Sequence, residues 1–422
     1  MQRYESFKPS GIPWVGDIPS HWGIKKNKFL LSERKAVVGK DAPKFKLLSL
    51  TLQGVILRDM ENPKGKFPAE FDTYKQVSPD DLIFCLFDVE ETPRTVGLAK
   101  HHGMITGAYT VTRCNEQVSS AFLYYYYLSL DEGKRLRSLY TGLRNVITRD
   151  TFFSLATPFP LREEQDRIVA FLDQKTAEID AAIAKKEQLI ELLDEQKTIL
   201  ISKAVTVGLN PDVQHHESRI EWIGKIPSHW QVKRAKYLFR EIDERSVSGD
   251  EELLSVSHMT GVTPRSEKAN VYMFMAEDYS GSKLCCPNDL VFNIMWAWMG
   301  ALGVSNRVGI VSPSYGVYRQ LKEGTFNNWY LEHLLRSTLY VAEYNKRSTG
   351  LHSSRLRLYS HMFFDMELGF PSREEQDEIE RETKKRVSLA DAVITSVQSE
   401  IEKLKELRSS LVASVVTGKI RV

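Results

Sequence analysis

Residues 10–31 read SGIPWVGDIPSHWGIKKNKFLL, and residues 218–239 read SRIEWIGKIPSHWQVKRAKYLF. The two stretches are identical at 12 of 22 positions and lie 208 residues apart in a chain of 422 residues. Agreement of this kind at a fixed separation indicates a duplicated structural unit. The chain is therefore predicted to contain two copies of one fold.

Further motifs repeat downstream in the same order. DDLIF at 80–84 corresponds to NDLVF at 288–292, again at an offset of 208. REEQD at 162–166 recurs at 373–377, at an offset of 211, so the second copy carries three extra residues before this motif. The duplication thus covers the whole chain, and each copy takes about half of it.

Each copy consists of a globular part and a long helix. The globular part contains short apolar runs between turn residues, such as Leu82–Leu86 and Leu290–Met295, and these predict strands. Residues 122–130 (FLYYYYLSL) and their counterpart at 329–339 are mostly apolar, so a helix and a buried strand both remain open. The predicted fold class is mixed α/β, of the α+β kind, with two globular domains alternating with two long helices.

The bounds of the predicted helices follow from local signals. Each begins after a proline, Pro160 or Pro371, with acidic residues in the first turn, and each ends near a glycine, Gly208 or Gly418. A helix over 163–205 is on the order of 60 Å long at about 1.5 Å per residue. These signals divide the chain into four segments: a globular domain at 1–161, a helix at 162–207, a globular domain at 208–372 and a helix at 373–422.

Both helices carry apolar residues at alternating spacings of three and four, which predicts a coiled-coil seam. The seam residues are Ile179, Ile183, Ile190, Leu193 and Leu200 in the first helix, and Ala390, Ile394, Val397, Ile401, Leu404 and Leu411 in the second. Lys197 and Arg408 occupy the same seam position in the two copies. Each is either a long side chain that reaches out of the seam to solvent or a polar contact that sets the helix register.

Composition excludes several classes of protein. The chain has 57 basic and 55 acidic residues, a net charge of +2, and 42% hydrophobic residues, as expected for globular domains. Residues 1–162 hold 23 basic and 17 acidic side chains, so a nucleic-acid surface is most plausible on the first domain. There is no apolar run of 18 residues, no signal-peptide pattern and only four cysteines, so we expect a cytoplasmic protein without a membrane anchor.

A search for catalytic motifs finds little. There is no phosphate-binding Walker loop, no GxGxxG, no HExxH, no GxSxG, no cysteine–histidine metal spacing and no Asn/Asp-Pro-Pro-aromatic motif of amino-methyltransferases. The closest candidates for an acidic catalytic cluster are Asp80, Asp81 and Asp289, but a turn before a strand explains them equally well. Two copies of a binding unit without such a motif indicate a recognition protein with no metal or cofactor of its own. A tandem RNA- or protein-binding adaptor with a coiled-coil spacer is the alternative.

The motifs as a set resemble those of the specificity subunit of type I restriction-modification enzymes. The resemblance covers essentially the whole chain. It rests on the segments at 14–22 (WVGDIPSHW) and 222–230, the two REEQD motifs, and GIVSPSY at 309–315. Each segment is modest alone, but duplicated and in order they are specific.

The resemblance implies a function for each part. Each globular domain would be a target recognition domain that reads one half of a bipartite sequence in double-stranded DNA. The helices would pack antiparallel as a spacer in a pseudo-twofold arrangement and would dock two methyltransferase subunits. Those partners would bind S-adenosylmethionine and methylate adenine, and separate restriction subunits would use ATP and magnesium to translocate and cleave DNA. This chain would hold no catalytic site.

Candidate DNA-contacting residues are basic, aromatic and histidine side chains, and among them Arg144 and His352 follow the shared TGL motifs at 141–143 and 349–351. The candidates are Arg58, Lys64, Lys66, Arg94, Lys100, His102 and Arg144 in the first copy, and Arg265, Lys268, Trp296, Trp298, Arg307, Tyr315 and His352 in the second. The segment MWAWMG at 295–300 is read either as a core strand or as an exposed aromatic turn that meets the duplex. The tryptophan pairs Trp14/Trp22 and Trp222/Trp230 are interpreted as structural.

Overall fold

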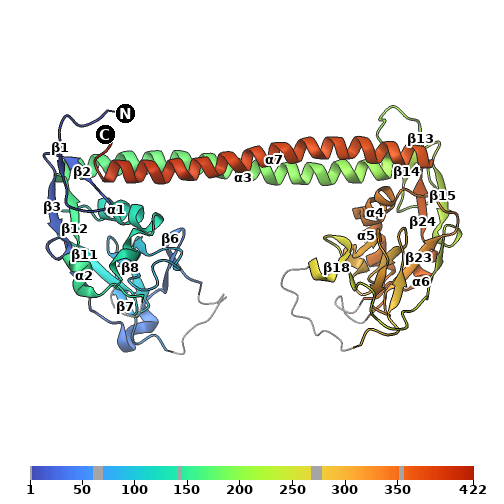
Figure 1. Cartoon of the computed structure of the whole chain (residues 1–422), viewed down its shortest axis with the longest axis horizontal. Helices are drawn as coiled ribbons and strands as arrows, with labels where there is room; N and C mark the ends of the chain where they lie inside the picture. The colour runs from blue at the N-terminus through green and yellow to red at the C-terminus, as the bar shows by residue number, and fades with distance from the viewer. Residues whose placement is uncertain (1, 60–69, 141–144, 268–277, 351–355) are drawn as a thin grey trace. The chain divides into compact units, whose positions relative to one another are not determined.

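The computed structural model describes residues 2–59, 70–140, 145–267, 278–350 and 356–422. It separates into two compact units, one made of 1–187 with 398–422 and the other of 188–397 (Figure 1). Each unit unites one globular domain with one half of each long helix, because those helix halves pack into the core of that domain.

The globular part of the first unit is built on antiparallel strands. Its central sheet has the order β4-β11-β8-β9, with β4 at Leu31–Glu33, β11 at Thr110–Cys114, β8 at Leu82–Phe84 and β9 at Val96–Leu98. Four two-stranded ladders surround it: β1–β2 (Phe7–Pro9, Asp17–Pro19), β3–β12 (Gly23–Lys26, Ala156–Phe159), β5–β6 (Leu48–Thr51, Gly54–Leu57) and β7–β10 (Lys75–Val77, Gly103–Ile105).

The second unit repeats this topology strand for strand. Its central sheet has the order β16-β23-β20-β21, with β16 at Phe239–Glu241, β23 at Gly316–Gln320, β20 at Leu290–Phe292 and β21 at Leu302–Val304. The matching ladders are β13–β14 (His215–Glu217, Lys225–Pro227), β15–β24 (Gln231–Arg234, Glu367–Phe370), β17–β18 (Leu254–Ser257, Gly261–Pro264) and β19–β22 (Lys283–Cys285, Gly309–Val311).

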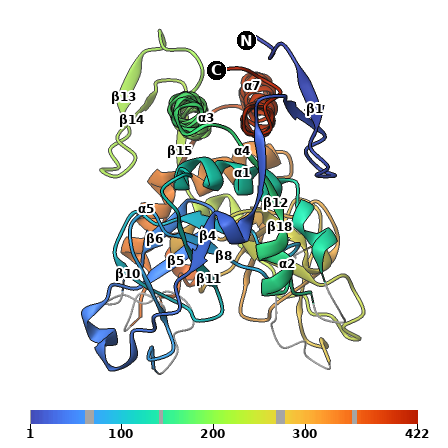
Figure 2. The same cartoon turned by 90° about the vertical axis from the view of Figure 1, so that its left-hand side faces the viewer.

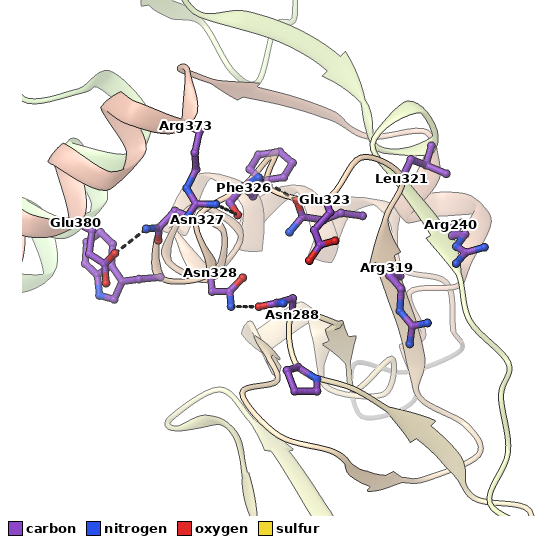
Figure 3. A pocket seen from close by; sticks show the side chains of 14 residues that line it. Arg240, Asn288, Arg319, Leu321, Glu323, Phe326, Asn327, Asn328, Arg373 and Glu380 are labelled. Atoms are coloured by element: carbon purple, nitrogen blue, oxygen red, sulfur yellow. Dashed lines mark hydrogen bonds between the residues drawn. The ribbon is translucent and has the colours of Figure 1, made fainter.

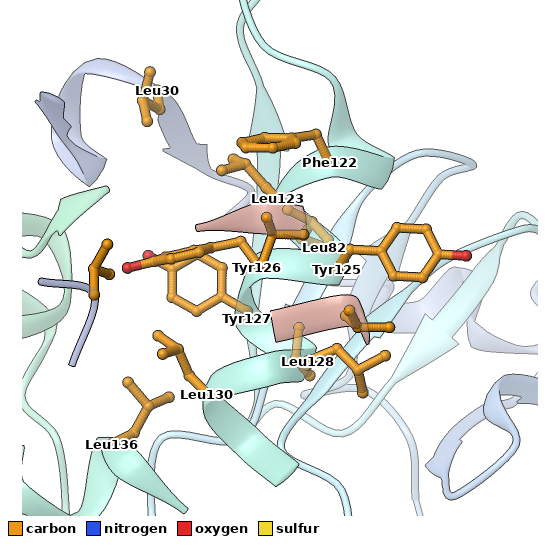
Figure 4. Close-up of a cluster of buried hydrophobic side chains, with 14 of the residues drawn as sticks. Leu30, Leu82, Phe122, Leu123, Tyr125, Tyr126, Tyr127, Leu128, Leu130 and Leu136 are labelled. Atoms are coloured by element: carbon orange, nitrogen blue, oxygen red, sulfur yellow. The ribbon is translucent and has the colours of Figure 1, made fainter. Parts of the chain in front are cut away.

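The segments that the sequence left open between helix and strand are helices. The apolar stretch of the first domain forms α1 (Ser120–Glu132), and its counterpart forms α4 (Asn328–Arg336) and α5 (Thr338–Arg347). The short helices are α2 (Arg149–Ser154) and α6 (Ser360–Phe364). Helix α1 is buried on nearly all sides because its residues fill the core around Tyr126 and Tyr127, and such burial removes the periodic pattern (Figure 4).

The long helices α3 (Arg162–Val207) and α7 (Arg373–Val416) lie side by side, seen end-on in Figure 2. In the first unit Arg408 of α7 lies 2.9 Å from Asp180 of α3, and Lys186 of α3 pairs with Glu400 of α7. The two helices therefore run antiparallel. In the second unit Lys197 lies 2.6 Å from Asp391. Lys197 and Arg408 thus make polar contacts between the helices, the second of their two sequence interpretations.

The predicted seam residues are all buried or half-buried. Ile394, Val397, Ile401 and Leu411 are buried, and the other predicted seam positions are half-buried: Ile179, Ile183, Ile190, Leu193, Leu200, Ala390 and Leu404. The helix at the end of the chain stops at Val416 rather than continuing to residue 422. Gly418 has a φ of +73°, which a left-handed turn requires, and a Cβ there would collide with Pro19.

The repeated motifs meet at the start of each long helix. In the first unit Glu164 accepts hydrogen bonds from Tyr4 at 2.7 Å and lies 2.9 Å from His21 Nε2. In the second unit Glu375 lies 2.7 Å from His229 Nε2 and accepts from Trp230 Nε1 at 3.1 Å. In each unit the PSHW motif therefore contacts the REEQD motif.

The glutamine of each REEQD motif is fully buried and joins two helix starts. Gln165 accepts from the backbone N–H of Ser119, the residue before α1, at 2.8 Å and donates to the carbonyl of Pro160 at 2.9 Å. Gln376 makes the same two bonds, to Asn327 at 2.9 Å and Pro371 at 3.1 Å. Each glutamine thereby ties a long helix to its globular domain.

This contact predicts a local loss of stability. Gln165→Leu leaves one backbone donor and one acceptor unpaired in the core, so we expect the first unit to lose about 2 kcal/mol or more of unfolding free energy. Gln376→Leu is expected to act on the second unit in the same way. Urea unfolding of the full chain, followed by tryptophan fluorescence, measures both. Glu163→Gln, at an exposed neighbouring position, is the control, and the interpretation is wrong if all three variants unfold like the original chain.

Candidate functional site

The surface hairpins place two of the candidate arginines at equivalent positions. Arg58 follows the hairpin β5–β6 and donates its backbone N–H to Leu47, while Arg265 follows β17–β18 and donates to Leu253. Both side chains are partly exposed. The hairpin turn differs, with two residues between the strands in the first copy and three in the second. A shared frame therefore presents arginine beside a loop of variable length.

The first domain carries a basic cluster beside this hairpin. Lys44, Lys46, His101 and His102 line a hollow of about 360 Å³ together with Leu57 and Phe45. Lys100 is exposed immediately before the two histidines. The grouping joins three separate parts of the sequence because the loop before β10 lies against the segment that leads into β5. Sequence analysis had selected Lys100 and His102 but missed Lys44 and Lys46.

The corresponding position in the second domain has a different charge. The backbone carbonyls of Lys46 and Glu252 accept equivalent bonds, from Met104 and Ile310, which aligns the two copies at this point. Arg307 then takes the place of His101, and its guanidinium lies 3.2 Å from Glu252. The candidate Arg307 is thus paired with a carboxylate, whereas on the same surface of the first domain Lys44 pairs with Asp41 and Lys46 and Lys100 add further positive charge. This position distinguishes the two domains.

The aromatic segment of the second domain forms a turn in which Trp296 is exposed and Ala297 is buried. Ala297–Met299 is a short 3-10 helix, so the core-strand interpretation was wrong, since the chain turns before Met295 can add to β20. Trp296 is 48% exposed and stacks on Trp298 with ring centres 6.0 Å apart. Trp298 Nε1 donates to the carbonyl of Met295 at 3.1 Å, which holds the pair in place. The first domain has DVEE at 88–91 in the corresponding turn.

Tyr315 is half-buried. It packs against a small cluster of buried residues that includes Val291 of β20 and Val311 of β22. Its hydroxyl accepts a hydrogen bond from the side chain of Asn293 at 2.9 Å. Burial raises the pKa of Tyr315, and the nearby charge of Arg265 opposes this. Tyr315 therefore ties the segment after β22 to Asn293, in the loop that leads to Trp296.

One candidate arginine lies mainly inside the fold. Arg94 is 15% exposed and lies 3.4 Å from the buried carboxylate of Asp131, which also accepts from the backbone of Thr95. Its burial against Asp131 suits a structural role. Five other candidates lie outside the described residues: Lys64, Lys66, Arg144, Lys268 and His352.

The acidic residues considered as a catalytic cluster are used in structure. Asp81 and Asp289 are almost completely buried, and each accepts a backbone N–H at the turn before its strand, from Ser78 at 2.7 Å and Cys286 at 2.8 Å. Each is also bound by two nitrogens of one arginine, Arg34 or Arg319. Within the described ranges, no group of three or more histidine, cysteine or acidic side chains could hold a metal ion. No helix in those ranges is long and apolar enough to cross a membrane.

Comparison with known proteins adds the class of fold. No family model matches the chain, and no curated protein matches its sequence. The structure is similar to a chain from a study of complex assembly and conformational transition of the type I R-M system, with a TM-score of 0.61, 14% identity, and coverage of 96% of this chain and 99% of that one.

A second similar structure is that of a single, named subunit. The HsdS subunit from Thermoanaerobacter tengcongensis matches with a TM-score of 0.50 and 14% identity over 96% of this chain and 98% of that one. The chain therefore has the fold of a type I restriction-modification specificity subunit. The resemblance inferred from the duplicated motifs is confirmed at the level of fold.

The basic cluster predicts a salt-dependent contribution to DNA binding. In the double variant Lys46→Ala/Lys100→Ala, we expect weaker binding and a reduced dependence of log affinity on log salt, by about one unit per phosphate contact removed. Fluorescence anisotropy on duplex DNA across a series of KCl concentrations measures this slope. Lys26→Ala, at an exposed site on β3, serves as the matched control. An unchanged slope in the double variant would exclude the cluster from the interface.

The aromatic turn predicts a contribution that does not depend on salt. Bases in a duplex are already stacked on one another, but an uncharged aromatic side chain can pack against a thymine methyl group in a groove, so Trp296→Ala should weaken binding to the recognised DNA by about tenfold with the salt slope preserved. The control is Tyr237→Ala, another exposed aromatic side chain of the same unit. If the two variants bind DNA with equal affinity, Trp296 contributes only to solubility or folding.

Proposed function

We propose that the chain is the sequence-specificity subunit of a type I restriction-modification complex. Each globular domain would read one half of a bipartite target in double-stranded DNA. The observation that carries the proposal is a duplicated scaffold whose surface loops differ in chemistry. Lys46 and His101 in the first domain correspond to Glu252 and Arg307 in the second, and the turn at 88–91 corresponds to the tryptophan turn at 296–299.

Different loops on one scaffold suit two different half-sites. Phosphate contacts position a protein on DNA, and base contacts give it specificity. A common frame would keep the docking geometry, while charge at one position and aromatic surface at another would select different bases. The first domain has the more basic surface of the two, so it would contribute more of the phosphate binding.

The long helices would set the separation of the half-sites. An α-helix has a fixed rise of about 1.5 Å per residue and does not stretch, which makes it a suitable spacer. The interhelical pairs Lys197–Asp391 and Arg408–Asp180 would resist sliding of one helix along the other. The same helices would dock two methyltransferase subunits, one for each half of the duplicated chain.

The chemistry would belong to the partners. Methyltransferase subunits would bind S-adenosylmethionine and methylate adenine, and restriction subunits would use ATP and magnesium to move along and cleave unmodified DNA. This chain would act in the cytoplasm, where that DNA lies, and would have no catalytic role of its own.

A map of methylated adenine tests the proposal. The chain is expressed with the methyltransferase subunit encoded beside it in a host that lacks adenine methylation, and the DNA is read by long-read modification sequencing. We expect one motif with two specified halves and a fixed unspecified gap. Replacing residues 1–161 by the same domain of another specificity subunit should change one half only. A soluble, associated pair that leaves DNA unmethylated contradicts the proposal, and RNA binding would then favour the adaptor.

A further inference from the structure

Each globular domain contains a cavity at the same place in the fold. The cavity of the first domain has a volume of about 640 Å³, and that of the second about 710 Å³. Both are framed by the turn before the central strand, at Pro79–Asp80 or Pro287–Asn288, and by the residues that begin α1 or α4. Figure 3 shows the second cavity, with Asn288 and Asn328 joined by a hydrogen bond of 2.6 Å across its floor.

Both cavities contain a bound arginine and a free one, although the two copies supply them from different strands. In the first domain Arg34, just after β4, binds the buried Asp81, and Arg113 on β11 has no side-chain partner among the described residues. In the second domain Arg319, at the position of Arg113, binds the buried Asp289. Arg240 on the neighbouring strand β16 is then the exposed arginine without a described partner, and it pairs in register with Arg319 (Figure 3).

The change in which strand supplies the bound arginine distinguishes a structural role from a binding role for the second arginine. One arginine per domain is sufficient to neutralise the buried aspartate, and a second guanidinium beside it adds repulsion without stabilising the fold. Both copies nevertheless keep the second arginine, and they do so although the first has changed its position. A free guanidinium retained in this way indicates a ligand that carries a carboxylate or phosphate group, which its planar donors suit.

A third arginine completes each cavity on the side of the long helix. Arg162 and Arg373 begin α3 and α7, and each is held by the aspartate one turn later, Asp166 at 3.0 Å or Asp377 at 2.9 Å. Each also donates to a backbone carbonyl at the cavity wall, of Glu116 or Phe326, at 3.3 Å. The cavity therefore joins the globular domain to the helix start.

We infer that these twin cavities receive an acidic side chain from each of two identical protein partners. The inference rests on the proposed function, in which two methyltransferase subunits bind this chain. DNA half-sites differ, and the surfaces assigned to them differ between the domains. The cavities are instead alike in position, size and arginine content, as one partner bound twice requires, although each is also lined by acidic residues, Asp80, Asp81 and Glu116 in the first and Glu323 and Glu380 in the second. The contact is an aspartate or glutamate of the partner on Arg113 and on Arg240.

Charge reversal at the two free arginines tests the inference. The variants are Arg113→Glu, Arg240→Glu and the double variant of the full chain, each mixed with the methyltransferase subunit encoded beside it. Native mass spectrometry and titration give the number of bound subunits and the affinity of each. Each single variant should weaken one of the two binding events by about tenfold or more, and the double variant should weaken both. Arg113→Ala and Arg240→Ala remove the donor without introducing repulsion and should act in the same direction.

Matched controls and alternative outcomes make the test decisive. Lys26→Glu and Lys233→Glu reverse exposed charges on equivalent ladders of the two domains and should leave both binding events unchanged. If the original chain binds two subunits and the double variant binds them equally well, the inference is wrong while the proposed function stands. Loss of affinity for DNA by the chain alone, with subunit binding intact, would assign the cavities to phosphate and also overturn it. An original chain that binds no methyltransferase overturns both.

Discussion

The buried glutamine at the start of each long helix is the contact on which the rest of the fold depends. Gln165 and Gln376 are completely buried, and each connects the proline before its long helix to the residue that precedes the domain's central helix. Next to them, Glu164 and Glu375 receive the histidine of the PSHW motif. Because a buried amide with its partners satisfied tolerates little rearrangement, the direction in which each helix leaves its domain is set at this point.

The end of each long helix is also fixed by contact with a globular domain. Gly208, after α3, lies against Trp230 of the second domain, and Gly418, after α7, lies against Trp22 of the first. The backbone N–H of Arg421 donates to Gln2 at 3.0 Å, so the two ends of the chain meet where the second unit has a continuous connection. Each helix thus begins on one domain and ends on the tryptophan of the other. Two tandem copies thereby form two like units, each built from residues far apart in sequence.

Comparison of the two copies also shows that some parts of each domain differ more between the copies than others. The turn before the central strand keeps an aspartate or asparagine with positive φ, at Asp80 and Asn288, because few other residues adopt that conformation. The buried aspartate after it keeps an arginine, but from either of two strands. The surface loops keep neither charge nor aromatic character. Scaffold, cavity and recognition surface therefore diverge to different degrees within one chain.

Local pattern in the sequence determined the duplication, the class of fold, the long helices and their seam, because repeats and heptads are properties of neighbouring residues. It left α1 undecided, since a helix such as Phe122–Leu130 that is buried on nearly all sides has no polar face to reveal its period. Tertiary structure decided which side chains meet. It placed Lys46 beside His102, buried Arg94 on Asp131, paired Arg307 with Glu252 and brought three arginines around each cavity. Those contacts join strands and loops distant in the chain, and only packing fixes which of them touch.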